Sequence, residues 1–296
     1  MSIRVRVTII ISLIVAIVCA ANLGVSLFLT QKHLLETSKA DIRVVADVAN
    51  EYVTTAIDLI KADAMTISQE VDDAPEGDLL KRLETELGYY ANFQALAVLT
   101  EDDVVAAHGR NPMSEDLLNS PAALRALDGK RGISSTYILM DGHIVFYVCA
   151  PMDGNRILAA TVDGMYFTKL IEQFQLWDTG YLFILDRDGT ILAHVRESWV
   201  QTRKNFINEA ETNEEYKGLA EVLTHMVQGE QYSGQYVLEG ENKLCGTTPI
   251  RGSEMGWSLA VVAPINESPL AHTRESLVIT AVLFLGACLF IAIIAS

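Results

Sequence analysis

The sequence predicts an α+β fold: two tandem modules with mainly antiparallel sheets, carried on one long N-terminal helix and flanked by two transmembrane helices. Three observations lead to this prediction. Apolar, uncharged runs stand near both ends of the chain, a helical apolar pattern follows the first run, and the part between contains an internal repeat. We expect a cytoplasmic N-terminus with the first span at 1–31, a stalk helix at 32–71, a first module at 72–175, a second module at 176–266, and a linker with the second span at 267–296.

The two apolar runs cover residues 7–31 and 276–296. At about 1.5 Å per residue, a helix of either length crosses a hydrocarbon core of about 30 Å. Arg4 and Arg6 precede the first run with no acid beside them, which predicts a cytoplasmic N-terminus. We therefore expect a multi-pass protein of the cell membrane with residues 32–273 outside the cytoplasm. A cleaved signal peptide is the alternative, but the first run is longer than the apolar region of such a signal.

The net charge and the cysteine content limit which partners and crosslinks we expect. The formal net charge is −16, and a surface of this sign repels nucleic acid, so we expect no nucleic-acid partner. Of the four cysteines, Cys19 and Cys288 lie in the apolar runs, whereas Cys149 and Cys245 fall in different predicted modules. A disulfide scaffold is therefore not predicted.

The segment 32–71 has the pattern of one amphipathic helix. Apolar or small residues recur at spacings of three and four, which places them on one face. The stripe consists of Leu34, Ser38, Val45, Val48, Tyr52, Ala56, Leu59, Ile67 and Val71. We expect this stripe to pack in the core and, through Val45, Val48, Tyr52 and Ala56, to pair with the same helix of a second copy in a homodimer.

The repeat aligns residues 95–108 (ALAVLTEDDVVAAH) without a gap on residues 181–194 (YLFILDRDGTILAH). Each copy has the pattern of a β-hairpin around an acidic turn. Both copies are followed by a helical stretch, a second hairpin and a last apolar strand. These elements are expected at 121–129, 137–151 and 157–162 in the first module, and at 215–229, 236–249 and 257–263 in the second.

The sequence contains no recognisable catalytic motif. The six histidines form no His-Glu-x-x-His pair, and Gly-x-Ser-x-Gly and phosphate-loop patterns do not occur. Residues 186–189 (DRDG) begin like a calcium loop but lack its later ligands, which favours a hairpin turn. His108 and His194 match in the repeat, and a structural role explains both without a metal. We therefore predict no catalytic residue, no metal and no cofactor in this chain.

The order of elements, and above all segment 180–194 (GYLFILDRDGTILAH), resembles the double Cache sensor domains of bacterial transmembrane receptors. The resemblance implies two PAS-like Cache modules, the first distal from the membrane and the second proximal. More narrowly, segments 3–8 (IRVRVT), 61–64 (KADA) and 149–152 (CAPM) resemble the sensory half of hybrid histidine kinases.

This resemblance implies a sensor of small molecules that passes ligand binding to the second span. The output is then expected on a histidine kinase core that normally follows the second span and is either removed here by truncation or carried by a separate cytoplasmic or intramembrane signalling partner. A chemotaxis-type or cyclic-dinucleotide receptor is the alternative. A membrane-anchored enzyme and a passive extracellular interaction module are alternatives from other classes.

The resemblance also implies that the ligand sits in the distal module. Asp163 resembles the acid that accepts a ligand ammonium in the family, and Tyr137 resembles a tyrosine of the preceding strand. The family's Arg-x-Trp-Tyr element is absent, which argues against an amino acid as ligand. From the residues themselves, we expect Tyr137, Tyr147 and Asp163 to converge in a pocket with Tyr89, Tyr90 or Arg110. Capping of the helix near residue 165 by Asp163, and packing of the tyrosines on the sheet, are the alternatives.

Overall fold

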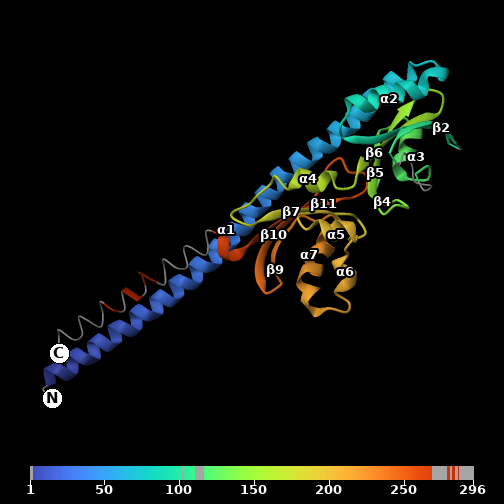
Figure 1. The fold of residues 1–296 in the computed structure, drawn as a ribbon. Coiled ribbons are helices and arrows are strands. Elements are labelled where there is room, and N and C mark those ends of the chain that lie inside the picture. Colours follow the sequence, from blue (N-terminus) through green and yellow to red (C-terminus); the bar gives the residue numbers. More distant parts are fainter. Residues whose placement is uncertain are drawn as a thin grey trace.

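The computed structural model describes residues 3–101, 103–110 and 117–268, and a few positions between 279 and 286. The first element is α1 (Ile3–Asp72), one continuous helix of 70 residues that would be about 105 Å long if straight. Its N-terminal part extends away from the rest of the molecule, and its second part lies along both modules (Figure 1). The predicted stalk and the predicted first span are thus parts of one helix.

Among the residues that the structure describes, no helix is both long and apolar enough to cross a membrane. Most of the predicted second span, 276–296, lies outside the described residues.

The distal module contains a six-stranded antiparallel sheet with strand order β2-β1-β6-β5-β3, to which β4 adds by pairing with β5. Its strands are β1 (Phe93–Leu99), β2 (Val104–Gly109), β3 (Gly132–Ile133), β4 (Tyr137–Ile138), β5 (Ile144–Met152) and β6 (Arg156–Asp163). Its helical elements are η1 (Glu76–Asp78), α2 (Leu79–Tyr89) and α3 (Pro121–Leu127).

The proximal module repeats this architecture with a five-stranded antiparallel sheet of order β8-β7-β11-β10-β9. Its strands are β7 (Tyr181–Leu185), β8 (Ile191–His194), β9 (Tyr232–Leu238), β10 (Glu241–Pro249) and β11 (Ser258–Pro264). The remaining helical elements are α4 (Tyr166–Ile171) between the sheets, then α5 (Glu197–Gln201), α6 (Phe206–Glu209), η2 (Glu214–Tyr216), α7 (Lys217–Val227) and η3 (Ile265–Glu267).

The predicted repeat is present in three dimensions. The first hairpin of each module has a register shift at the same place in the repeat, between Val98 and Leu99 and between Ile184 and Leu185. A bulge at one fixed position bends and twists a hairpin in the same way each time. The α+β prediction with two antiparallel sheets after a long helix is therefore confirmed.

The largest core cluster lies between α1 and both sheets. The buried face of α1 contributes small and β-branched residues from Ile42 to Val71, and strands of both modules contribute to the same cluster. Two further clusters cover the opposite faces of the sheets, one beneath α3 in the distal module and one beneath α6 and α7 in the proximal module. Each module therefore has three layers, with α1 as the layer that both share.

The predicted stripe on the stalk is wrong as a single face. Ala56, Ile67 and Val71 are buried against the sheets, whereas Val48 and Tyr52 are exposed. The reason is that steps of three or four residues allow a stripe to drift around the helix, so that the predicted set combines residues from two faces. The exposed apolar residues are Val44, Val48, Tyr52 and Leu59, and we call this set the exposed stalk stripe.

Candidate ligand-binding site

Three of the predicted site residues lie on one face of the distal sheet. Tyr137 on β4 is opposite Val145 on β5, and Val145 is opposite Asp163 on β6. Tyr147 stands two residues after Val145 and therefore projects from the same side of the strand. This is the face away from α1, because Val145 and Tyr147 pack in the cluster beneath α3.

The two tyrosines contact each other across β4 and β5. Their ring centroids are 5.5 Å apart and the rings are tilted by 53°. Tyr147 is fully buried and Tyr137 is half-buried. Tilted aromatic pairs at this distance stabilise a fold beyond the area that they bury. The pair gives this face of the sheet an aromatic wall.

Asp163 ends β6 and precedes α4. Its Oδ1 accepts a hydrogen bond from the backbone N–H of Met165 at 2.8 Å, and its Oδ2 lies 3.6 Å from Nζ of Lys169. The N-cap residue of α4 is Met165, and no side chain caps this helix, so Asp163 closes the turn before α4 and the predicted capping role is wrong. The carboxylate side chain is 38 % exposed and Lys169 is 67 % exposed, so a second cation can reach Oδ2 from solvent.

Arg110 follows β2 and reaches the turn between β4 and β5. Its Nη2 is 3.0 Å from Nε2 of His143, whose Nδ1 is 3.0 Å from Oδ2 of Asp141. Because a guanidinium only donates, we assign Nε2 as the acceptor and place the proton of the neutral ring on Nδ1, toward Asp141. The contact joins the edge strand β2 to the hairpin on the other side of the sheet.

Tyr89 is not brought to this group. It is the last residue of α2, it is 75 % exposed, and α2 buries Leu79 and Leu83 on the α1 side of the sheet. Conversely, the buried Thr161 lies opposite Tyr147 and stands two residues before Asp163, so it belongs to the site face and was missed. Strand alternation from Asp163 would have found it.

The proximal module has a small aromatic cavity of about 10 Å³, enough for about one water molecule. It is lined by His194, Tyr181, Trp199, Tyr236 and six further residues. Nδ1 of His194 accepts the backbone N–H of Arg196 at 2.8 Å, and burial lowers the pKa of His194 to about 3. This neutral, packed ring matches the predicted structural role. Within the described part of the chain, no group of His, Cys, Asp or Glu is arranged to hold a metal ion.

The comparisons with known proteins identify the class. Residues 29–270 match the double Cache type of the Cache domain family, and the chain belongs to this family. The predicted double Cache sensor domain is thereby confirmed. None of the curated proteins matches the chain.

Solved structures share the fold at low sequence identity. The ligand-binding domain of the Pseudomonas fluorescens chemoreceptor CtaA, in complex with L-isoleucine, has a TM-score of 0.61 and 13 % identity, and covers 81 % of this chain and 98 % of its own. The ligand-binding domain of the Pseudomonas aeruginosa PAO1 amino acid chemoreceptor PctB, in complex with L-Arg, has a TM-score of 0.60 and 15 % identity, and covers 79 % and 98 %. The extracellular domain of mmHK1S-Z3, a protein assigned as a histidine kinase, has a TM-score of 0.59 and 17 % identity, and covers 82 % and 98 %.

Proposed function

We propose that this chain is the extracytoplasmic sensing part of a transmembrane receptor. We also propose that it binds a small molecule on the face of the distal sheet that points away from α1. The observation that carries the proposal is the register that brings Tyr137, Tyr147 and Asp163 to one face of a Cache module. Aromatic walls with a few fixed polar groups are the usual composition of a small-molecule site.

The proposed role includes a membrane topology that rests on the apolar runs of the sequence. The apolar runs 7–31 and 276–296 act as the two spans, with the N-terminus in the cytoplasm and residues 32–273 outside. The helix α1 continues without interruption from the first run into the stalk, so the span and the sensor are joined mechanically. The output is a histidine kinase, or a chemoreceptor as the second candidate, and structural neighbours of both kinds have this fold.

The ligand carries an ammonium group that pairs with Asp163. One carboxylate oxygen accepts the N–H of Met165 in the turn before α4, whereas the other lies 3.6 Å from the exposed Lys169, which a ligand cation can replace. Arg110 is the candidate partner for an anionic group of the same ligand. Primary amines and amino acids are therefore the first compounds to test, because the neighbours CtaA and PctB were solved with L-isoleucine and L-Arg.

The receptor acts as a homodimer that pairs through the exposed stalk stripe. Val44, Val48, Tyr52 and Leu59 recur on the outer side of α1, and Val44 and Val48 are 63 % and 62 % exposed. Apolar residues at such spacings are the usual seam between two parallel helices. The pairing places the two first spans side by side in the membrane.

A thermal-shift screen of the full chain in lipid nanodiscs tests the proposed function. A compound at about 100 times its Kd stabilises the folded state by about 2.7 kcal/mol and raises Tm. Asp163→Asn is expected to lose this response, whereas the matched variant Lys169→Ala keeps it, because Lys169 only neutralises Asp163 in the absence of ligand. Failure of every amine, amino acid and anion to raise Tm would contradict the proposal.

A further inference from the structure

Two side chains of the proximal module hold two of the three residues that precede Tyr137. Both β3 and β4 pair with β5, but residues 134–136 between them leave the regular ladder. We call these residues the strap. Nη1 of Arg203 donates to the carbonyl oxygen of Thr136 at 2.7 Å and lies 3.0 Å from its Oγ1. The hydroxyl of Ser135 donates to the carboxylate of Asp186.

The strap also fixes Tyr147 from the other side. The backbone N–H of Ser134 donates to the carbonyl of Tyr147 at 2.9 Å, and the N–H of Tyr147 donates to Oγ of Ser134 at 2.9 Å. The strap therefore forms hydrogen bonds with the main chain of Tyr147 and continues directly into Tyr137. Thr136 directly precedes Tyr137, so the bonds from Arg203 to Thr136 hold the backbone next to Tyr137.

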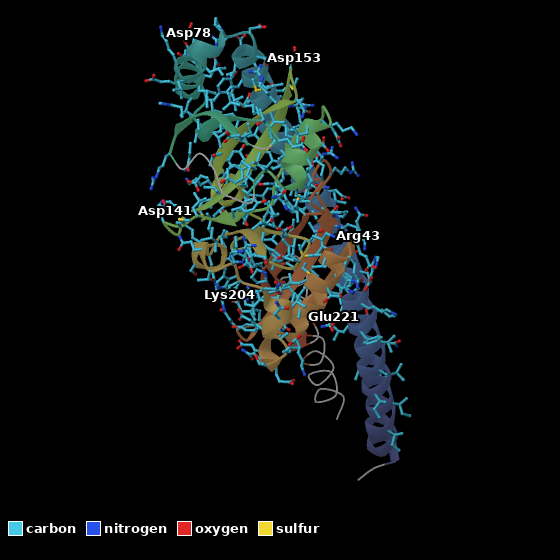
Figure 2. All side chains as sticks on the ribbon, turned by 90° about the vertical axis from the view of Figure 1, so that its right-hand side faces the viewer. Arg43, Asp78, Asp141, Asp153, Lys204 and Glu221 are labelled. Carbon is cyan, nitrogen blue, oxygen red and sulfur yellow. The ribbon has the colours of Figure 1, made fainter. Side chains whose placement is uncertain are left out.

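Asp186 and Arg203, which hold the strap, differ from ordinary surface residues in burial and in backbone conformation. Asp186 is 6 % exposed in the turn between β7 and β8, and burial raises the pKa of its carboxyl group. Arg203 follows α5 with a φ of +49°, in the left-handed region that residues other than glycine rarely adopt. In Figure 2, Lys204, which follows Arg203, and Asp141, at the tip of the Tyr137 hairpin, lie on the same side of the molecule.

A second contact between the modules lies elsewhere and offers a matched control. Arg125 on α3 of the distal module is 3.5 Å from Glu254 of the proximal module, and Glu254 also contacts Lys61 on the stalk. This contact joins the modules without touching the strap or the tyrosines. It separates an effect on the ligand site from a general loosening of the interface.

We infer that Arg203 and Asp186 are positioning residues for the ligand site: they hold the strap, and through it the aromatic wall of Tyr137 and Tyr147, so that the proximal module senses the state of this wall directly. The inference rests on the proposed function, in which this face binds the ligand. Coupling of this kind is reciprocal, because a contact that transmits a displacement in one direction also transmits it in the other.

Amide hydrogen exchange of the full chain in lipid nanodiscs tests the inference without any ligand. Arg203→Ala is expected to speed exchange in residues 137–147 by about tenfold, which corresponds to about 1.4 kcal/mol. Arg203→Lys restores part of the protection because the lysine keeps one donor. Ser135→Ala is a milder variant that removes only the bond to Asp186, and it speeds exchange in the same segment by a smaller factor.

Two further measurements distinguish a positioning role of Arg203 and Asp186 from a role in holding the two modules together in general. The control Arg125→Ala should leave exchange in residues 137–147 within about twofold of the wild type, a difference below about 0.4 kcal/mol. In the reverse direction, Tyr137→Ala should speed exchange in residues 199–206, around Arg203. Unchanged exchange at 137–147 in Arg203→Ala and Ser135→Ala, or equal acceleration over both modules in all variants, would overturn the inference. Because no ligand is added, this outcome is independent of whether the thermal-shift screen finds one.

Discussion

Nζ of Lys61, on the stalk helix, lies 2.7 Å from Oε1 of Glu254 in the loop between β10 and β11. The lysine is only 5 % exposed and donates a second hydrogen bond to the carbonyl of Gly252 at 2.8 Å. A buried ammonium at this depth is stable because Glu254 and the carbonyl of Gly252 accept hydrogen bonds from it. The pair therefore fixes the position of the proximal module along the stalk helix.

Removal of the Lys61 charge should weaken the fold. Lys61→Met leaves Glu254 with the more distant Arg125 alone, and loss of one partner of a buried pair costs about 3–5 kcal/mol, with the lower end expected here because Glu254 is partly exposed. Equilibrium denaturation measures the change. Lys39→Met is the control, since Lys39 pairs with the exposed Glu36 within α1, and it should cost less than about 1 kcal/mol.

Stability should fall on acidification through His194. Its pKa is about 3 in the folded protein against 6.5 for an ordinary histidine, so the unfolded chain takes up the proton first. This contribution to stability is present above pH 6.5 and is lost as the pH falls toward 3, by about 1.4 kcal/mol per pH unit at its steepest.

Denaturation midpoints of the wild type and His194→Asn between pH 7 and pH 4 measure this slope. Asn keeps an acceptor for the N–H of Arg196, and the variant should lose less stability on acidification than the wild type. His33→Asn, at an exposed position on α1, is expected to follow the wild-type curve. Parallel curves for His194→Asn and the wild type would show that the ring is not kept neutral by burial.

Asp163→Ala should abolish the response to an ammonium ligand and leave the proximal module folded. Loss of its hydrogen bond to Met165 alone costs about 1 kcal/mol of stability. Loss of the carboxylate that pairs with a ligand ammonium is expected to cost about 2–5 kcal/mol of affinity, roughly 30-fold to 5,000-fold. Calorimetry with the ligand from the screen separates the two roles. Binding within about threefold of the wild type would leave Asp163 with a structural role only, in the turn before α4, and direct attention to Arg110.

Single cysteines on the exposed stalk stripe should crosslink between two copies in membranes. Val44→Cys, Val48→Cys and Tyr52→Cys lie on the outer side of α1, and an interface there brings each of them close to its symmetry mate. Ala49→Cys and Val53→Cys are the controls, because both side chains are buried against the sheets. Equal crosslinking at all five positions would argue against pairing through this stripe.

The elements that were predicted correctly are those with a local signal. Alternation and turn residues placed both repeat hairpins, and the Asp141-Gly142 turn placed the hairpin of β4 and β5, since Gly142 has a φ of +82°. In contrast, α2 was not predicted. Asp78 stands at the N-cap position, but its side chain forms no capping hydrogen bond, and this helix of 11 residues packs Leu79 and Leu83 in the cluster that includes α1.

The site could be predicted only in part for a similar reason. Tyr137, Tyr147 and Asp163 share a face because they lie on neighbouring strands, and strand alternation reveals this. The strap cannot be recognised in the same way. Ser135 and Thr136 look like ordinary loop residues, and their partners Asp186 and Arg203 stand far away in the chain, so that only the three-dimensional structure shows the contact.

The helix α1 has a consequence for how a signal can travel. It runs unbroken from Ile3 to Asp72, and its buried face touches the sheets of both modules. A hydrogen-bonded helix resists any change of its length. A shift of the distal module therefore cannot be absorbed by compression of the part of α1 that lies between the two modules. A rearrangement in the distal module therefore reaches the N-terminal end of α1 as a rotation, tilt or sliding of the whole helix. The contacts between α1 and the proximal module set the direction of this movement.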